Sequence, residues 1–137
     1  MADWILDRLA CGSFEDAQAP EPRITVIMNL SERAYSSTAR LIHAPFPDEV
    51  YLEPLLWSER VAQLRELLHS RETVLVHCRL GKSRSPSLCA AYLMACGMAT
   101  ERALQYVTTR RHLAQPHAET WRGVLAWYKE HSHAQAS

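Results

Sequence analysis

The sequence has little glycine, few aromatic residues and no excess of charge of either sign. Glycine accounts for 4 of its 137 residues, and aromatic residues make up 8%. The 15 lysine and arginine residues balance the 15 aspartate and glutamate residues, so the formal net charge is zero. A chain without a basic excess lacks the general attraction that draws proteins to nucleic acids or anionic membranes, although a local basic pocket remains compatible with it. We therefore expect no nucleic-acid partner.

Long apolar runs and patterned cysteines are lacking as well. No apolar run approaches the ~20 residues that span a bilayer, and charged residues interrupt the first one, so we expect neither membrane insertion nor a signal peptide. The spacing of the 4 cysteines matches no zinc-binding pattern, and the chain is too large and too apolar to need disulfides. They are Cys11, Cys78, Cys89 and Cys96. Free thiols in a reducing cytosol fit best, and we expect a cytoplasmic protein with no metal and no cofactor.

The rest of the composition is that of an ordinary globular protein. Apolar residues make up 47% of the chain and charged residues 22%, which argues against disorder. A chain of this length is expected to form one domain and to bury roughly two-thirds of its unfolded surface. We predict a single domain over residues 1–137, with a core at about 4–130 and a polar tail at 131–137, and we expect a monomer.

Strand and helix patterns alternate along the chain. The run at 24–28 is continuous and rich in β-branched residues, which is typical of a strand buried on both faces. Further strands are predicted at 4–10 (a strand or hairpin arm), 40–44 and 73–77, and helices at about 14–19, 53–69, 85–96, 100–112 and 117–130. This alternation predicts the α/β class, as a single domain whose central, mainly parallel sheet of four to five strands is flanked by helices.

Three of the predicted helices indicate how they are buried. The helix at 85–96 is apolar nearly all round, which predicts a central, enclosed helix. The helices at 53–69 and 117–130 each carry apolar residues on one face. These residues are Trp57, Val61, Leu64 and Leu68 in the first, and Trp121, Val124, Leu125 and Tyr128 in the second.

The segment between the strand at 73–77 and the helix at 85–96 reads His77-Cys78-Arg79-Leu80-Gly81-Lys82-Ser83-Arg84-Ser85. A loop that leaves the carboxyl end of a strand and opens a helix is where open α/β sheets bind anions. Five residues separate Cys78 from Arg84, which lets the backbone curl round a tetrahedral anion with its amides turned inward. Gly81, at mid-loop, can adopt backbone angles that other residues avoid. The sequence therefore predicts a phosphate site with a nucleophile at its base.

Cys78 and Arg84 have the chemistry that such a site needs. Cys78 is a nucleophile only as a thiolate, a form that a helix N-terminus and a nearby arginine favour. Arg84 can hold two phosphate oxygens in a bidentate way that lysine cannot. A lone cysteine at a strand end is more often a buried, inert thiol. The charged, glycine-containing loop argues against that alternative, because an inert thiol has no need of such surroundings.

The pattern His77-Cys78-(five residues)-Arg84-Ser85 resembles the signature loop of the cysteine-based protein tyrosine phosphatases. Residues 9–17 resemble the usual "LxxGSxxDA" start of their small dual-specificity branch, and 27–31 resemble its second strand. The resemblance covers about residues 4–130. It implies the dual-specificity phosphatase fold and the hydrolysis of phosphate monoesters through a phosphocysteine intermediate.

The resemblance also implies a role for each loop residue. Cys78 would attack phosphorus, and Arg84 would bind the phosphoryl oxygens and stabilise the transition state. Ser85 would stabilise the departing thiolate, with helix capping as its alternative role. His77 would orient the loop. The substrate-binding backbone would comprise Arg79, Leu80, Gly81, Lys82, Ser83 and Arg84.

The general acid of the family lies on a separate loop. Asp48 precedes Cys78 by 30 residues (78 − 48 = 30) and lies on the proline-braced segment 45–49, where this branch usually places its acid. General acid catalysis contributes about 10²–10⁴-fold to a rate. An aspartate after a proline is, taken alone, an ordinary turn residue. Glu49 is the nearest rival and Glu53 a distant one.

Two features depart from the family pattern. The segment 110–117 resembles one that often reads "R…PN", whose asparagine braces the signature loop, but His117 stands in its place. Either His117 or Gln115 takes that role, or neither does. Arg79 and Lys82 occupy positions where phosphoinositide phosphatases carry basic residues that hold additional phosphates; the alternative is that both side chains point to solvent.

The resemblance leaves the substrate open. A small domain with little sequence for a deep cleft predicts a shallow, permissive pocket for phosphorylated proteins or peptides, with phosphoinositides and other polyanionic phosphate esters as the alternative. Two further classes are a phosphate-binding module without turnover and a rhodanese-like sulfurtransferase. The sulfurtransferase loop is typically one residue shorter and needs no Asp48, so a thiosulfate assay separates it. Cys89 and Cys96 are interpreted as packing residues, with a redox partnership to Cys78 as the alternative.

Overall fold

The computed structural model describes the backbone of residues 1–136 and the side chains of residues 1–131. Strands and helices alternate, which confirms the predicted α/β class. The strands are β1 (Asp3–Leu6), β2 (Leu9–Gly12), β3 (Val26–Asn29), β4 (Arg40–His43) and β5 (Val74–His77). The helices are α1 (Phe14–Gln18), α2 (Pro54–His69), α3 (Arg84–Ala95), α4 (Thr100–Arg110) and α5 (Ala118–Ala136).

The strands form one five-stranded sheet in the order β1-β2-β5-β3-β4. The pair β1 and β2 is antiparallel, whereas β2, β5, β3 and β4 run parallel to one another. The mainly parallel sheet is therefore confirmed. His77 at the end of β5 lies in register with Gly12 of β2 and Asn29 of β3. The segments that follow these three strands consequently leave the sheet along one edge, which is where parallel sheets bind ligands.

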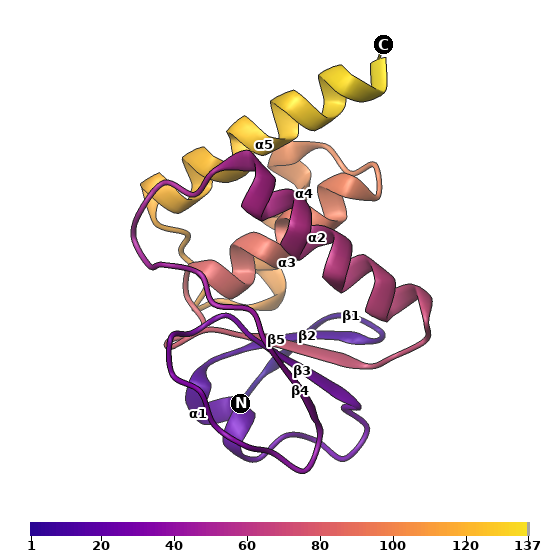
Figure 1. Ribbon diagram of the computed structural model, residues 1–137, viewed down its shortest axis with the longest axis vertical. Helices are drawn as coiled ribbons and strands as arrows, with labels where there is room; N and C mark the ends of the chain where they lie inside the picture. The colour runs from indigo at the N-terminus through magenta and orange to yellow at the C-terminus, as the bar shows by residue number, and fades with distance from the viewer. Residues whose placement is uncertain (137) are drawn as a thin grey trace.

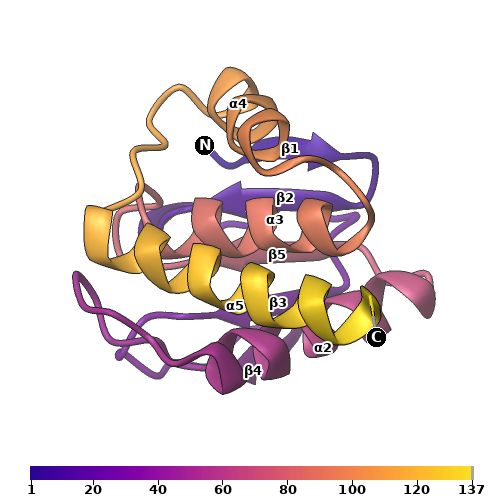
Figure 2. The same ribbon diagram turned by 90° about the horizontal axis from the view of Figure 1, so that it is seen from above.

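The helices are unevenly divided between the two faces of the sheet (Figure 1). Helices α2, α3, α4 and α5 cover one face, and the short α1 lies on the other. Seen from above, α3 runs over the middle strands, with α4 near β1 and α2 near β4 (Figure 2). Helix α3 packs against α2, α4 and α5 as well as the sheet. Every residue from Arg84 to Met94 is buried as a result, which confirms the predicted enclosed helix.

Local sequence sets the ends of several elements. Ser13 caps α1 in a capping box: its hydroxyl accepts from the Asp16 N–H at 3.1 Å, and the Asp16 carboxylate accepts from the Ser13 N–H at 2.9 Å. Pro54 opens α2, where its missing N–H costs no helical hydrogen bond. Gly97 follows α3 with a φ of 105°, a conformation that glycine adopts without strain.

Helix α2 buries the face that its spacing predicted, since Trp57, Val61, Leu64 and Leu68 all belong to the core. The prediction for α5 was partly wrong. Leu125 is 43% exposed, and Trp127 is buried instead and donates from Nε1 to Ser58 Oγ at 3.1 Å. Because α5 packs against both α2 and α3, its buried face is set by two neighbours that the spacing alone does not locate.

Two helix ends also differ from the predictions. Helix α4 ends at Arg110, and the chain then turns to bring Arg111 under the loop after β5. Helix α5 continues to Ala136, so most of the segment predicted as a polar tail is helical, and residue 137 lies outside the described residues. Among the described helices, none has the length and apolar character needed to cross a membrane.

Candidate active site

Cys78 is the first residue after β5 and lies 2% exposed beneath the loop that leads to α3. Its Sγ is 3.2 Å from Ser85 Oγ and 3.5 Å from the Ser85 backbone N. The Ser85 hydroxyl also donates to the Gly12 carbonyl at 3.2 Å. Cys11 Sγ lies 3.5 Å from Ser85 Oγ. Ser85 is therefore brought together with Cys78, with its hydroxyl fixed by the adjacent strand β2.

Cys78 opens on a cavity of about 400 Å³. Leu80, Lys82, Ser83 and Arg84 contribute to its wall from the loop, and Asp48 and Glu49 contribute from the segment after β4. Gln115, Pro116 and His117 contribute from the segment before α5, and Ala118, the first residue of α5, completes the wall. Leu80 is 53% exposed, so an apolar side chain lies next to the charged groups at the mouth.

Three carbonyls of the loop are turned away from the cavity by groups outside the loop. The Arg79 carbonyl accepts from the Phe14 N–H at 3.0 Å, and the Lys82 carbonyl accepts from the Gln115 N–H at 2.6 Å. The Gly81 carbonyl accepts from Arg111 Nε at 2.7 Å. In a planar trans peptide the N–H points opposite to the carbonyl. The next amides, those of Leu80, Lys82 and Ser83, therefore point to the other side.

These amides are available to a ligand. Within the described residues, no backbone N–H from Arg79 to Arg84 donates a hydrogen bond to another protein group. Gly81 makes the tight path feasible, because its φ is 70°. The loop thus has the form predicted from its spacing, with unpaired amides above a sulfur at the start of a helix.

Arg84 is 1% exposed and is anchored by one end of its guanidinium. Its Nη1 donates to Glu32 Oε1 at 2.7 Å, to the Phe46 carbonyl at 2.9 Å and to the Leu30 carbonyl at 3.4 Å. Its Nε has no hydrogen-bond partner and lies 3.4 Å from Asp48 Oδ1. The edge formed by Nε and Nη2 is therefore the part of the fork that remains for a ligand.

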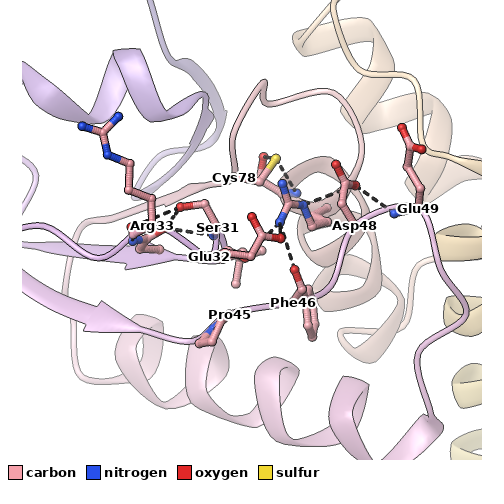
Figure 3. A network of polar contacts seen from close by, with 12 residues as sticks. Ser31, Glu32, Arg33, Pro45, Phe46, Asp48, Glu49 and Cys78 are labelled. Atoms are coloured by element: carbon pink, nitrogen blue, oxygen red, sulfur yellow. Dashed lines mark hydrogen bonds and ion pairs between the residues drawn. The ribbon is translucent and has the colours of Figure 1, made fainter.

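Asp48 comes from the segment after β4 and lines the same cavity as Cys78 (Figure 3). Its side chain is 41% exposed, and its carboxylate accepts from the Glu49 N–H at 3.0 Å. Glu49 has a φ of 57°, so the chain turns sharply directly after Asp48. Glu53 is the residue before α2 and is absent from the cavity wall, so the structure separates it from the other two carboxylates.

His77 is fully buried, and its two ring nitrogens have different partners. Nδ1 lies 3.1 Å from the Cys78 carbonyl, and Nε2 lies 2.8 Å from the Tyr35 hydroxyl. Because a carbonyl only accepts, Nδ1 carries the proton and Nε2 accepts from Tyr35. Burial lowers the pKa of His77 below its ordinary value of 6.5 and raises the pKa of Tyr35 to about 12. A neutral His77 therefore fixes the Cys78 carbonyl.

The side chains of His117 and Gln115 do not brace the loop. His117 contributes its backbone N–H, which donates to Ser83 Oγ at 2.9 Å, while its Nδ1 accepts from the Glu119 N–H at 3.2 Å. Gln115 contributes its backbone N–H to Lys82. The side chain that reaches the loop is that of Arg111.

The structure separates the two extra cations of the loop. Lys82 lies in the wall of the cavity above Cys78. Arg79 instead lines a second cavity of about 290 Å³, together with Phe14, Ser31 and Arg33. These two side chains are thus not brought together.

Sequence reasoning missed Glu32, Arg111 and Tyr35. Glu32 follows β3, a neighbour of β5, and residues after adjacent parallel strands share one edge. Arg111 follows the buried Ala103 and Val107 at four-residue steps, so helical spacing could have indicated that it, and not Arg110, is buried. Tyr35 lies in an irregular segment and gave no such signal.

A parallel α/β sheet whose central strand ends in a buried thiol, unpaired amides and a buried arginine defines an anion-binding protein equipped for nucleophilic chemistry. The family model for the dual specificity phosphatase catalytic domain matches residues 10–130. The chain therefore belongs to the dual-specificity phosphatase family, as its resemblance indicated.

Individual relatives agree with this assignment. Human dual specificity phosphatase 28 is 30% identical over 120 residues, which cover 87% of this chain and 61% of that protein. Its crystal structure superposes with a TM-score of 0.86 at 25% identity, covering 97% of this chain and 99% of the other. The structure of a mouse protein assigned to the dual specificity phosphatases, in complex with zinc tungstate, superposes with a TM-score of 0.83 at 25% identity. The superposition covers 98% of this chain and 90% of the mouse chain. The chain spans less than two thirds of the length of several curated relatives that it matches.

Proposed function

We propose that the protein hydrolyses phosphate monoesters in two steps, with Cys78 as the nucleophile and Arg84 as the phosphate ligand. The observation that carries this proposal is the combination of a buried sulfur, outward-turned loop carbonyls and a buried guanidinium whose Nε makes no hydrogen bond, all around one cavity. A tetrahedral dianion matches these donors in charge and number. The tungstate bound to the mouse relative is an oxyanion of that shape, which supports the proposal.

In the first step the Cys78 thiolate attacks phosphorus. A sulfur–phosphorus bond forms while the bond to the ester oxygen breaks, and Asp48 gives its proton to the departing oxygen. Asp48 is favoured over Glu49 because its carboxylate lies 3.4 Å from Arg84 Nε, the group proposed to hold the phosphate.

In the second step water attacks the phosphocysteine. The Asp48 carboxylate accepts a proton from that water, the sulfur–phosphorus bond breaks, and inorganic phosphate leaves. The Ser85 hydroxyl, 3.2 Å from Cys78 Sγ, turns its proton from the Gly12 carbonyl to the thiolate as the thiolate departs. No electrons are exchanged with an oxidant or reductant in either step.

Phosphorylated proteins or peptides are the proposed substrates. The apolar groups at the mouth of the cavity, Leu80, Pro116 and Ala118, offer contact area to the residues on either side of a phosphorylated side chain. A cytoplasmic location remains our expectation, because the mechanism requires a reduced Cys78.

Lys82 favours a second substrate class, the polyanionic phosphate esters such as phosphoinositides. Its side chain lies in the wall of the cavity and can pair with a second phosphate. Arg79 lines another cavity, so Arg79→Ala is the matched control for Lys82→Ala. A phosphoinositide preference that falls in Lys82→Ala and persists in Arg79→Ala supports this class; an unchanged preference in both variants excludes it.

Turnover of p-nitrophenyl phosphate tests the proposed function. The wild type should hydrolyse it with EDTA present, whereas Cys78→Ser should bind vanadate without turnover. Appreciable turnover by Cys78→Ser would refute the nucleophile, and complete loss in EDTA would argue against the class. A wild type that binds vanadate without turnover would be a phosphate-binding module, and thiosulfate turnover would point to a sulfurtransferase.

A further inference from the structure

Arg111, the residue after α4, is a buried cation that reaches the loop above Cys78. It is 1% exposed, and its Nε donates to the Gly81 carbonyl at 2.7 Å. Its Nη1 donates to Asp3 Oδ2 at 2.9 Å and to the Cys11 carbonyl at 3.4 Å, and its Nη2 lies 3.8 Å from Asp16 Oδ2. One guanidinium therefore connects the loop to β1, β2 and α1.

The partners of Arg111 divide into two groups with different consequences. Asp3 and Asp16 balance its charge, which a buried guanidinium requires. The Gly81 carbonyl carries no formal charge, so its hydrogen bond to Nε does not neutralise Arg111. This bond instead fixes the orientation of the carbonyl. A carbonyl held outward turns the N–H of the same peptide, that of Lys82, toward the opposite side.

Of the three outward carbonyls, this is the one held by a side chain. Those of Arg79 and Lys82 are held by backbone amides of Phe14 and Gln115, which no side-chain substitution removes. The orientation of the peptide between Gly81 and Lys82 thus depends on the identity of residue 111. Lysine at this position keeps a charge for Asp3 but lacks a planar fork that reaches Gly81 at the same time.

We propose that Arg111 is a positioning residue of the dual-specificity phosphatase loop, which holds the Gly81–Lys82 peptide so that the Lys82 N–H faces the phosphate. The inference rests on the proposed function, because it assigns the loop amides to a phosphate. It also replaces the bracing role expected of His117 or Gln115 with one carried by Arg111.

Arg111→Lys is the first test, with Arg110→Lys as its matched control. Arg110 is the exposed neighbour, and its Nη1 reaches the Tyr106 carbonyl at 3.4 Å, away from the loop. In Arg111→Lys, kcat/KM for p-nitrophenyl phosphate should fall about 100-fold, the scale of a misplaced catalytic group, and vanadate should bind more weakly. Arg110→Lys should retain both values. Circular dichroism and urea unfolding give the folded fraction by which each rate is corrected.

A purely structural role for Arg111 predicts a different result. Arg111→Lys would then lose stability, but its folded fraction would turn over substrate and bind vanadate like the wild type, and that outcome overturns the proposal. Asp3→Asn removes a charge partner and leaves the bond to Gly81, so its folded fraction should keep its vanadate affinity. If Arg111→Lys does not fold, the double variant Asp3→Asn/Arg111→Gln, which removes both charges, is compared with Asp3→Asn.

Vanadate affinity separates this inference from the proposed function. A wild type that binds vanadate without turnover would refute the hydrolase, and the affinities of the Arg111 variants would still test the positioning role. A wild type that turns over substrate, with an Arg111→Lys variant of equal kcat/KM and equal vanadate affinity, would refute the positioning role and leave the hydrolase intact.

Discussion

The side chain of Glu32 is 62% exposed, yet its Oε1 lies 2.7 Å from Nη1 of Arg84, whose side chain is 2% exposed. A residue from the segment after β3 thus fixes the inner end of a guanidinium whose outer edge faces the cavity. The Phe46 carbonyl, 2.9 Å from the same Nη1, supplies a second anchor from the segment after β4. The Arg84 side chain is therefore held in one orientation before a phosphate binds. It loses less conformational entropy on binding than a mobile arginine would.

Replacing Glu32 by glutamine should weaken phosphate binding without abolishing it. The charge-assisted bond to Arg84 becomes neutral, but water reaches Glu32 and screens its charge, so we expect an effect of about 5- to 10-fold on kcat/KM. Inhibition by inorganic phosphate measures the binding part. Glu101→Gln, on the exposed first turn of α4, is the control. An unchanged phosphate inhibition constant in Glu32→Gln would contradict the anchoring role.

Asp48→Asn should slow hydrolysis most where the leaving group needs a proton. For phenyl phosphate or a phosphoserine peptide we expect a loss of about 10²–10⁴-fold, and a much smaller loss for p-nitrophenyl phosphate, whose leaving group departs without help. Single-turnover rates measure the first step. Glu49→Gln, in the same cavity wall, is the matched variant. Equal losses with both leaving groups, or a larger loss in Glu49→Gln, would remove Asp48 from the acid role.

Gly81→Ala and Gly97→Ala form a pair that separates backbone strain from crowding. Both glycines have positive φ, 70° and 105°, so each alanine should cost about 1 kcal/mol for its conformation. A Cβ at Gly97 meets nothing within 4 Å, whereas one at Gly81 clashes with Arg111 Nη2 and lies 2.7 Å from the Gly12 carbonyl. Urea unfolding should show the larger loss for Gly81→Ala, and turnover should fall in that variant alone. Equal losses of stability with full activity in both would show that the loop tolerates displacement.

His77 should make the fold less stable as the pH falls. Burial lowers the pKa of His77 in the folded protein below the 6.5 expected of the unfolded chain. The unfolded state therefore binds its proton first, and stability is fully present above pH 6.5 and is lost as the pH falls through the folded pKa. Urea unfolding at several pH values, in the wild type and His77→Gln, isolates this contribution. His77→Gln should lose less stability than the wild type on acidification, and His69→Gln, at an exposed position, is the control. Equal pH dependence of stability in the wild type and His77→Gln would refute the contribution assigned to His77.

The sequence predicted those features that depend on residues close together in the chain. The strands near 24–28, 40–44 and 73–77, the enclosed helix α3 and the positions of Cys78 and Ser85 follow from apolar runs and from a loop with fixed spacing. The segment predicted at 4–10 as one strand or hairpin arm instead forms the two antiparallel strands β1 and β2. What the sequence did not reveal are partners from distant segments. Glu32 is 52 residues from Arg84, and Arg111 is 30 residues from Gly81, and only the folded sheet brings them together.

The groups that brace the loop in place of the family's asparagine also come from positions that the sequence did not indicate. The family pattern places the bracing group near position 117, which points to a side chain there. The structure uses backbone amides of Gln115 and His117 in addition to the Arg111 guanidinium. Backbone groups carry no sequence signal, so no pattern in a single chain could have identified them.

A covalent phosphate on Cys78 is the central claim, and acid quenching followed by mass spectrometry tests it most directly. The wild type, mixed with p-nitrophenyl phosphate and quenched within one turnover, should yield a Cys78 peptide heavier by one phosphoryl group. Cys78→Ser should yield no phosphorylated peptide. Ser85→Ala should accumulate more of the phosphocysteine than the wild type does, because the thiolate then leaves without its hydrogen-bond donor. Rapid turnover by the wild type with no phosphate on Cys78, or with phosphate on another residue, would contradict the account.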